Sequence, residues 1–129
     1  LERACRQNPA RSALEKGIRF SIHLDTPVTP INPLLLVWSA VNRLSTGGNP
    51  IGEDERISAL QALRATTIDA AWQIFQEDNR GSIEVGKLAD LVILSENPLT
   101  VDKTQIKDIR VEQTFVGGRS VYQRIQDSA

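Results

Sequence analysis

The residues with the clearest chemical potential are His23 and Asp25, which lie two positions apart just before a proline-rich segment. Side chains two apart in a β-strand project from the same face, so an extended chain would place the imidazole beside the carboxylate. Such a carboxylate could ligate a metal ion or act as a base. The structural alternative is a solvated sheet face ending at an aspartate turn. For His23 alone, a packed or hydrogen-bonded role is the commoner one for a strand histidine.

A strictly alternating segment precedes and contains these two residues. Its apolar positions are Ile18, Phe20, Ile22 and Leu24, and its polar positions are Arg19, Ser21, His23 and Asp25. This period of two predicts a strand over residues 18–24. A helix end is predicted over residues 10–16, closed by Gly17 in the left-handed conformation. Pro27, Pro30 and Pro33 predict a loop over residues 26–32 after the strand.

Helices are expected over most of the next 45 residues. Asn32 is suited to cap a helix whose first position is Pro33, and this helix is predicted to run to about residue 44. The apolar spacing over residues 57–75 predicts two short helices, with Thr67 as the N-cap of the second. The charged residues 53–56 are interpreted as solvated, and Trp38 and Trp72 as packing residues.

Beyond residue 80 the composition favours strands. Residues 82–85, 89–94 and 109–116 are rich in β-branched residues between turn signals, and each is predicted to be a strand. Gly117-Gly118 has the signature of a two-residue hairpin turn. The sequence therefore predicts a boundary near residue 80 between an α/β part and an all-β part.

Several segments, in one order, resemble the amidohydrolase superfamily and specifically its amidohydrolase 3 branch. They are Phe20-Ser21-Ile22-His23-Leu24-Asp25-Thr26-Pro27-Val28-Thr29-Pro30, Asn32-Pro33-Leu34, Ala40-Val41-Asn42-Arg43, Arg56-Ile57-Ser58, Ala62-Leu63-Arg64-Ala65-Thr66, Ala70-Ala71, Gly81-Ser82-Ile83-Glu84-Val85-Gly86-Lys87-Leu88-Ala89-Asp90-Leu91-Val92-Ile93-Leu94 and Val116-Gly117-Gly118. The resemblance covers nearly the whole chain, and the segment from Gly81 to Leu94 is its most characteristic part.

The resemblance implies an α/β fold class: the last strand and helices of a (β/α)8 barrel, followed by the C-terminal part of a small β-sandwich. Residues 1–79 would be the end of the barrel, and residues 80–129 would belong to the composite sandwich domain. Arg19, Ser21, His23 and Asp25 would then point into the barrel, with Asp25 at its catalytic mouth, while the apolar positions would face the helices.

The resemblance also implies a role for Asp25, the position that matches the family's aspartate at the end of the eighth strand. That residue touches a divalent metal, expected to be zinc, takes a proton from the attacking water and passes it to the leaving group. His23 is a second catalytic candidate, close to the metal or the substrate, with a purely structural role as the alternative. The family's remaining ligands, including a His-x-His pair, are not in this sequence, which has one histidine.

We therefore expect the C-terminal part of a metal-dependent enzyme that hydrolyses a non-peptide carbon–nitrogen bond, such as an amide, formamide or cyclic amide. The chain by itself is expected to be inactive, because a catalytic zinc site typically takes three protein ligands. The absence of methionine from the sequence favours the same view of a piece of a longer chain. The alternative, from another class, is a non-catalytic binding or assembly module that retains the fold.

Composition narrows the expected partners. Fifteen basic and sixteen acidic residues are interspersed, so a nucleic-acid partner is not expected. The longest apolar run, residues 34–38, is far short of the roughly 20 residues that span a bilayer, so no membrane segment is expected. Cys5 is the one cysteine and has no internal disulfide partner, and cytoplasmic localisation is the default expectation. A single barrel strand and half a sandwich would leave apolar faces and strand edges uncovered, so self-association is expected. The family resemblance implies a small-molecule substrate as the other partner.

Overall fold

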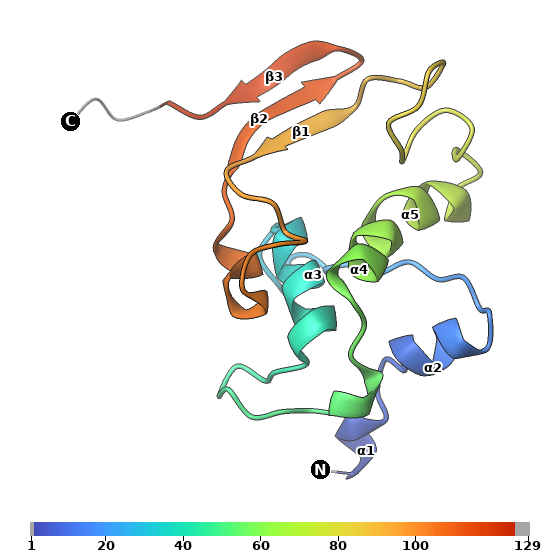
Figure 1. Cartoon of the computed structure of the whole chain (residues 1–129), viewed down its shortest axis with the longest axis vertical. Coiled ribbons are helices and arrows are strands. Elements are labelled where there is room, and N and C mark those ends of the chain that lie inside the picture. Colours follow the sequence, from blue (N-terminus) through green and yellow to red (C-terminus); the bar gives the residue numbers. More distant parts are fainter. Residues whose placement is uncertain (1, 126–129) are drawn as a thin grey trace.

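A computed structural model describes residues 2–125, and its helical part precedes its sheet (Figure 1). The helices are α1 (Glu2–Cys5), α2 (Ala10–Glu15), α3 (Pro33–Asn42), α4 (Ala59–Thr66) and α5 (Ile68–Gln73). Two 3-10 helices, η1 (Glu53–Glu55) and η2 (Lys103–Asp108), lie between other elements, and the strands are β1 (Leu91–Leu94), β2 (Val111–Val116) and β3 (Arg119–Gln123). A mixed α and β architecture is therefore confirmed.

Helix α3 begins where its sequence predicts and ends two residues before the predicted residue 44. The Asn32 side-chain oxygen accepts hydrogen bonds from the backbone amides of Leu34, at 3.1 Å, and Leu35, at 3.4 Å. Pro33 occupies the first helical position, where a missing amide hydrogen leaves no bond unmade. At the other end Arg43 is left-handed, with φ of 52°, and α3 ends at Asn42.

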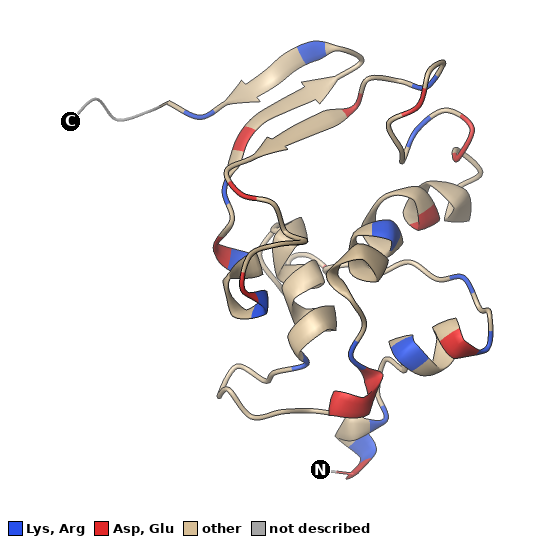
Figure 2. Cartoon of the chain, in the orientation of Figure 1, with Lys and Arg blue, Asp and Glu red and all other residues tan. Residues whose placement is uncertain are grey.

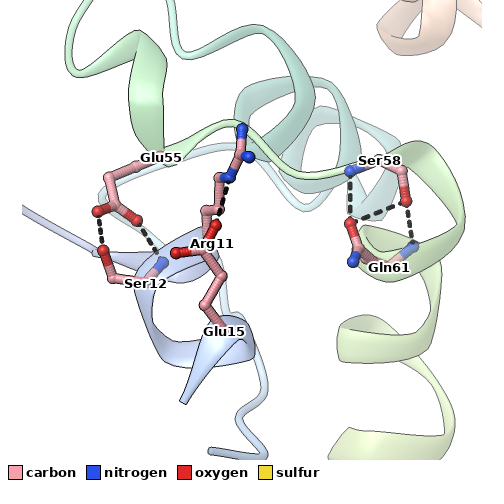
Figure 3. Close-up of polar contacts among 6 residues, drawn as sticks. All are labelled: Arg11, Ser12, Glu15, Glu55, Ser58 and Gln61. Atoms are coloured by element: carbon pink, nitrogen blue, oxygen red, sulfur yellow. Dashed lines mark hydrogen bonds and ion pairs between the residues drawn. The ribbon is translucent and has the colours of Figure 1, made fainter. Parts of the chain in front are cut away.

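Two short helices follow, as predicted, but their caps differ from the prediction. Helix α4 begins with a capping box between Ser58 and Gln61 (Figure 3). The Ser58 side-chain oxygen accepts a hydrogen bond from the Gln61 backbone amide at 3.2 Å, and the Gln61 side-chain oxygen accepts one from the Ser58 backbone amide at 2.8 Å. Thr67 precedes α5 without capping it, because its hydroxyl donates to the carbonyl of Leu63 at 2.7 Å instead. The expected Thr67 side-chain cap was therefore wrong.

Helix α2 receives its cap from a distant residue. Pro9 at its N-cap makes no side-chain cap hydrogen bond. The Glu55 carboxylate of η1 takes that place and accepts hydrogen bonds from the amide and the hydroxyl of Ser12 (Figure 3). The interpretation of Glu55 as a solvated charge was wrong, since an acceptor at a helix N-terminus satisfies an amide that would otherwise lack a partner. The predicted end of α2 is confirmed, with Gly17 at φ of 69°.

The hydrophobic core lies between α3, α4 and η2. Its buried members are Val37, Val41, Ile57, Ala62 and Ile106. Ile106 is 0% exposed, although η2 lies beyond the residues predicted to be helical. The buried Asn42 amide donates to the Lys103 carbonyl at 2.9 Å, and the Trp38 indole donates to the Thr104 carbonyl at 2.9 Å. The predicted packing role of Trp38 is confirmed, because this indole joins α3 to the segment between two strands.

The sheet is antiparallel in the order β1-β2-β3. Val116 pairs with Arg119 around Gly117-Gly118, so the predicted hairpin is confirmed. The strand predicted over residues 82–85 is absent from the described structure, where Ser82 forms a bend, residues 83–84 are irregular and Val85 begins a turn. Three side chains hold it together: Lys87 Nζ donates to Ser82 Oγ at 2.6 Å, Ser82 Oγ donates to Glu84 at 2.5 Å, and Lys87 lies 3.3 Å from Glu84.

Large apolar side chains remain accessible on the sheet. The sheet residues with exposed large side chains are Leu91, Val92, Ile93, Val116, Val121 and Tyr122. Val92 and Tyr122 both pair in register with Thr114, so they lie on one face of the sheet. Lys, Arg, Asp and Glu occur in both the helical part and the sheet part (Figure 2). Among residues 2–125, no helix has the length and apolar character that crossing a membrane requires.

Candidate functional site

The segment that carries His23 and Asp25 is extended but is not a strand. Within the described chain it pairs with no other segment in a ladder, and one backbone hydrogen bond joins it to α4, from the Ile22 amide to the Ala65 carbonyl at 3.3 Å. The strand predicted over residues 18–24 is therefore not formed here. A strand needs a neighbouring strand to bond to its backbone, and an alternating sequence alone does not provide one.

The apolar side of this segment is partly covered. Phe20 packs against the core formed by α3, α4 and η2, as the expectation of helix-facing apolar residues requires. Ile18, by contrast, is 54% exposed. Phe20 therefore packs against the core as the alternation predicts, whereas residues 2–125 do not bury the apolar face as a whole.

The first two polar residues of the segment contact α5. Arg19 Nε lies 2.6 Å from Asp69 Oδ1, and its guanidinium stacks 4.8 Å from the centre of the Trp72 ring. The Ser21 hydroxyl donates to the Gln73 side chain. The prediction that Arg19 and Ser21 point into a barrel is not what this structure shows, because both side chains are bonded to a helix.

His23 and Asp25 are both exposed, beyond the residues that contact α5. Within the described residues, neither side chain makes a hydrogen bond or an ion pair with another residue. Asp25 is in the left-handed conformation, with φ of 54°. This conformation is uncommon for a residue with a Cβ, and aspartate is one of the few that adopt it readily. The Asp25 carboxylate is thus available to accept a proton or to bind a cation.

A tight turn begins at Asp25. The Val28 amide donates to the Asp25 carbonyl at 2.8 Å, and the Thr29 hydroxyl donates to the Leu24 carbonyl. The prolines of residues 26–33 leave few backbone donors in this loop, so these two bonds contribute much of its closure. The sequence predicted the loop, but it gave no signal for the hydroxyl bond of Thr29.

The described residues do not bring together a complete set of metal ligands. Within residues 2–125, no group of three or more His, Cys, Asp or Glu side chains could hold a metal ion. Cys5 belongs to α1, at the opposite end of the helical part from the sheet (Figure 1). Asp25 fits a divalent cation as one hard oxygen ligand, and the remaining ligands of a complete site would have to come from other residues.

Three carboxylates away from Asp25 have lowered pKa values. The pKa of Glu55 is lowered mainly by the hydrogen bonds from Ser12. The Ser82 hydroxyl and then Lys87 lower the pKa of Glu84, and the Thr104 hydroxyl and amide lower the pKa of Asp102. Each of these acids closes a turn or a helix end, so their environments indicate structural roles.

Comparison with known proteins gives a consistent family. Residues 2–122 match the model of the amidohydrolase family. An N-substituted formamide deformylase of Arthrobacter pascens is 35% identical over 116 residues, which are 90% of this chain and 21% of that protein. The putative amidohydrolase YtcJ of Bacillus subtilis (strain 168) is 32% identical over 117 residues, which are 88% of this chain and 22% of that protein.

A solved structure resembles the fold. The crystal structure of an amidohydrolase from Thermotoga maritima MSB8 aligns with a TM-score of 0.68 at 24% identity, covering 89% of this chain and 26% of that one. This chain covers 21% of the Arthrobacter pascens deformylase and 22% of YtcJ, so it spans about a fifth of the length of these two relatives.

Proposed function

Because the chain belongs to the amidohydrolase family, we propose that it is the C-terminal part of a metal-dependent hydrolase that cleaves a non-peptide carbon–nitrogen bond. In this proposal residues 1–79 complete a (β/α)8 barrel and residues 80–129 complete a small β-sandwich. The substrate is an amide, a formamide or a cyclic amide. Support comes from the family match, and from a 35% identical relative whose name states that it deformylates N-substituted formamides.

Asp25 is the proposed catalytic residue. The observation that carries this assignment is its exposed carboxylate at the end of an extended segment, in a left-handed conformation held by a closed turn. An unusual backbone conformation that its surroundings maintain is a common feature of functional residues. The carboxylate has no partner among the described residues that would occupy its oxygens, so both remain available to substrate, water or a cation.

The proposed chemistry is proton transfer by Asp25. A divalent cation, zinc in this proposal, would supply the positive charge that makes a water molecule acidic near neutral pH. Asp25 accepts the proton of that water as it attacks the carbonyl carbon. The carboxyl group then gives the proton to the leaving nitrogen, which departs as a neutral amine. His23, two residues earlier on the same segment, is proposed to assist near the metal or the substrate.

The isolated chain is proposed to be inactive. One aspartate and one histidine offer at most two ligands, and three protein ligands are typical of a catalytic zinc site. The missing ligands would belong to parts of a longer protein. The same shortage supports the second candidate, a binding or assembly module that keeps the family fold without catalysis.

An assay of the longer protein separates these candidates. The protein that carries this chain in its natural context is incubated with N-substituted formamides, cyclic amides and simple amides, with zinc and after chelation. We expect hydrolysis of at least one of these classes, to a free amine or ammonia, or to the amino group of an opened ring, with loss of turnover after chelation and recovery on adding zinc. Absence of turnover by the zinc-loaded protein across all three classes would favour the non-catalytic module.

A further inference from the structure

We propose that Thr29 is a positioning residue that holds Asp25 in its productive direction, through a hydrogen bond to the preceding carbonyl. This inference rests on the proposed role of Asp25 and adds a residue to it. The relevant feature is the pair of hydrogen bonds that closes the loop: Thr29 hydroxyl to Leu24 carbonyl, and Val28 amide to Asp25 carbonyl at 2.8 Å.

These two bonds hold the peptide groups on both sides of the Asp25 Cα atom. The Leu24 carbonyl belongs to the peptide plane whose rotation defines φ of Asp25, and the Asp25 carbonyl belongs to the plane whose rotation defines ψ. Fixing both planes fixes both torsions, and therefore the direction of the Cα–Cβ bond. Thr29 controls the first of these planes.

The held conformation is one that needs support. Asp25 has φ of 54°, in the left-handed region, which costs an L-residue up to roughly 1–2 kcal/mol and costs aspartate less than most. The Asp25 side chain makes no hydrogen bond among the described residues, so the two hydrogen bonds that close the loop are what hold this conformation. The Thr29 hydroxyl bond is partly buried, so it competes with water less than a fully exposed bond would.

Loss of the Thr29 hydrogen bond should affect catalysis by changing the direction of the Asp25 carboxylate. A proton acceptor must lie within hydrogen-bond reach of the attacking water, and small misplacements of a reacting group cost large factors in rate. Releasing the Leu24 carbonyl would let φ of Asp25 relax and would swing the carboxylate away. Binding of the rest of the substrate would be affected less, because Thr29 is not proposed to touch it.

The test uses Thr29→Val, which keeps the branched shape without the hydroxyl, and Thr29→Ser, which keeps the hydroxyl. In the longer protein, Thr29→Val is expected to lower kcat roughly ten- to a hundredfold with a small change in KM. Thr29→Ser is expected to stay within about threefold of wild type. Hydrogen exchange of residues 24–32, followed by mass spectrometry, should become roughly fivefold faster in Thr29→Val and remain unchanged for α4.

Each outcome of these experiments supports or overturns the positioning role of Thr29. Wild-type kcat in Thr29→Val, while Asp25→Asn is inactive, overturns the positioning role and leaves the proposed function in place. A low kcat in both Thr29→Val and Thr29→Ser overturns it too, because the effect would then belong to side-chain shape and not to the hydroxyl. If Asp25→Asn keeps its turnover, the proposed function fails, and the exchange measurement alone still tests whether Thr29 closes the loop.

Discussion

The carboxylate of Glu55 lies at the N-terminus of α2, where its Oε2 atom accepts a 2.9 Å hydrogen bond from the Ser12 amide. The residues are 43 positions apart, so this bond joins α2 to η1. Because the hydrogen bonds from Ser12 favour the ionised form, the pKa of Glu55 is lowered from its ordinary value in the folded state.

A depressed folded pKa makes stability depend on pH. The contribution of Glu55 is present above its unfolded pKa and is lost as pH falls through the lower folded pKa. Urea unfolding between about pH 6 and about pH 3 should therefore show a smaller loss of stability for Glu55→Gln than for wild type. Asp54→Asn, a change at the exposed neighbour in η1, should keep the wild-type dependence. Equal acid slopes for wild type and Glu55→Gln would show that this bond does not couple protonation to folding.

A side chain at Gly81 should destabilise the fold more than one at Gly86. An added Cβ would lie 2.8 Å from the Ala71 Cβ and 2.8 Å from the Ile68 Cα, and φ is +92°. Gly86 is the matched control, because its φ is +97° and a Cβ there meets nothing within 4 Å. Both alanine variants incur the backbone strain of a positive φ. Because Gly81→Ala also overpacks against α5, its free energy of unfolding should be lower than that of Gly86→Ala by about 1–3 kcal/mol. Equal losses of unfolding free energy in urea would show that α5 moves aside without cost.

Self-association should depend on the sheet. Val92 and Tyr122 are 52% and 49% exposed and flank Thr114 on one face, while the outer edges of β1 and β3 have no partner strand in the described sheet. Sedimentation of the 129-residue chain is expected to show dimers or larger species. Val92→Lys should raise the dissociation constant at least about tenfold. Val28→Lys, on the proline loop and 77% exposed in the wild type, is the control that should change nothing. A wild-type chain that stays monomeric over a wide concentration range would contradict the prediction.

Zinc should bind only weakly to the isolated chain. His23 and Asp25 offer at most two protein ligands, and tight sites need three or four in a preformed geometry. Isothermal titration should therefore give weak binding that decreases further in Asp25→Asn. Tight binding at one zinc per chain by a monomer would mean that the ligand set has been misjudged.

Local patterns predicted the elements whose stabilising contacts are close in sequence. Asn32 and Pro33 fixed the start of α3, and Gly117-Gly118 fixed the hairpin, because caps and tight turns depend on a few adjacent residues. The alternation of residues 18–24 was a weaker guide, since a strand also requires a partner that this chain does not supply within the described residues.

Contacts between distant residues account for the rest. These contacts join segments that are far apart in sequence. Glu55 caps α2, η2 packs on α3, and Arg19 and Ser21 bond to α5. Asp25 itself was selected by resemblance to a family and by its place at the end of an alternating segment. Its left-handed backbone and the Thr29 bond came from the structure, because no sequence pattern encodes them.

The most direct test of the central claim is the turnover of Asp25→Asn in the longer protein. Asparagine keeps the size and the left-handed tolerance of aspartate but cannot accept the proton, so kcat should decrease at least roughly a hundredfold. The fold, measured by circular dichroism and thermal unfolding, should be unchanged, and His23→Ala should lower kcat less. Asp78→Asn, at another exposed aspartate, should retain wild-type kcat. A folded, zinc-loaded Asp25→Asn protein with wild-type kcat would contradict the assignment of Asp25 as the proton acceptor.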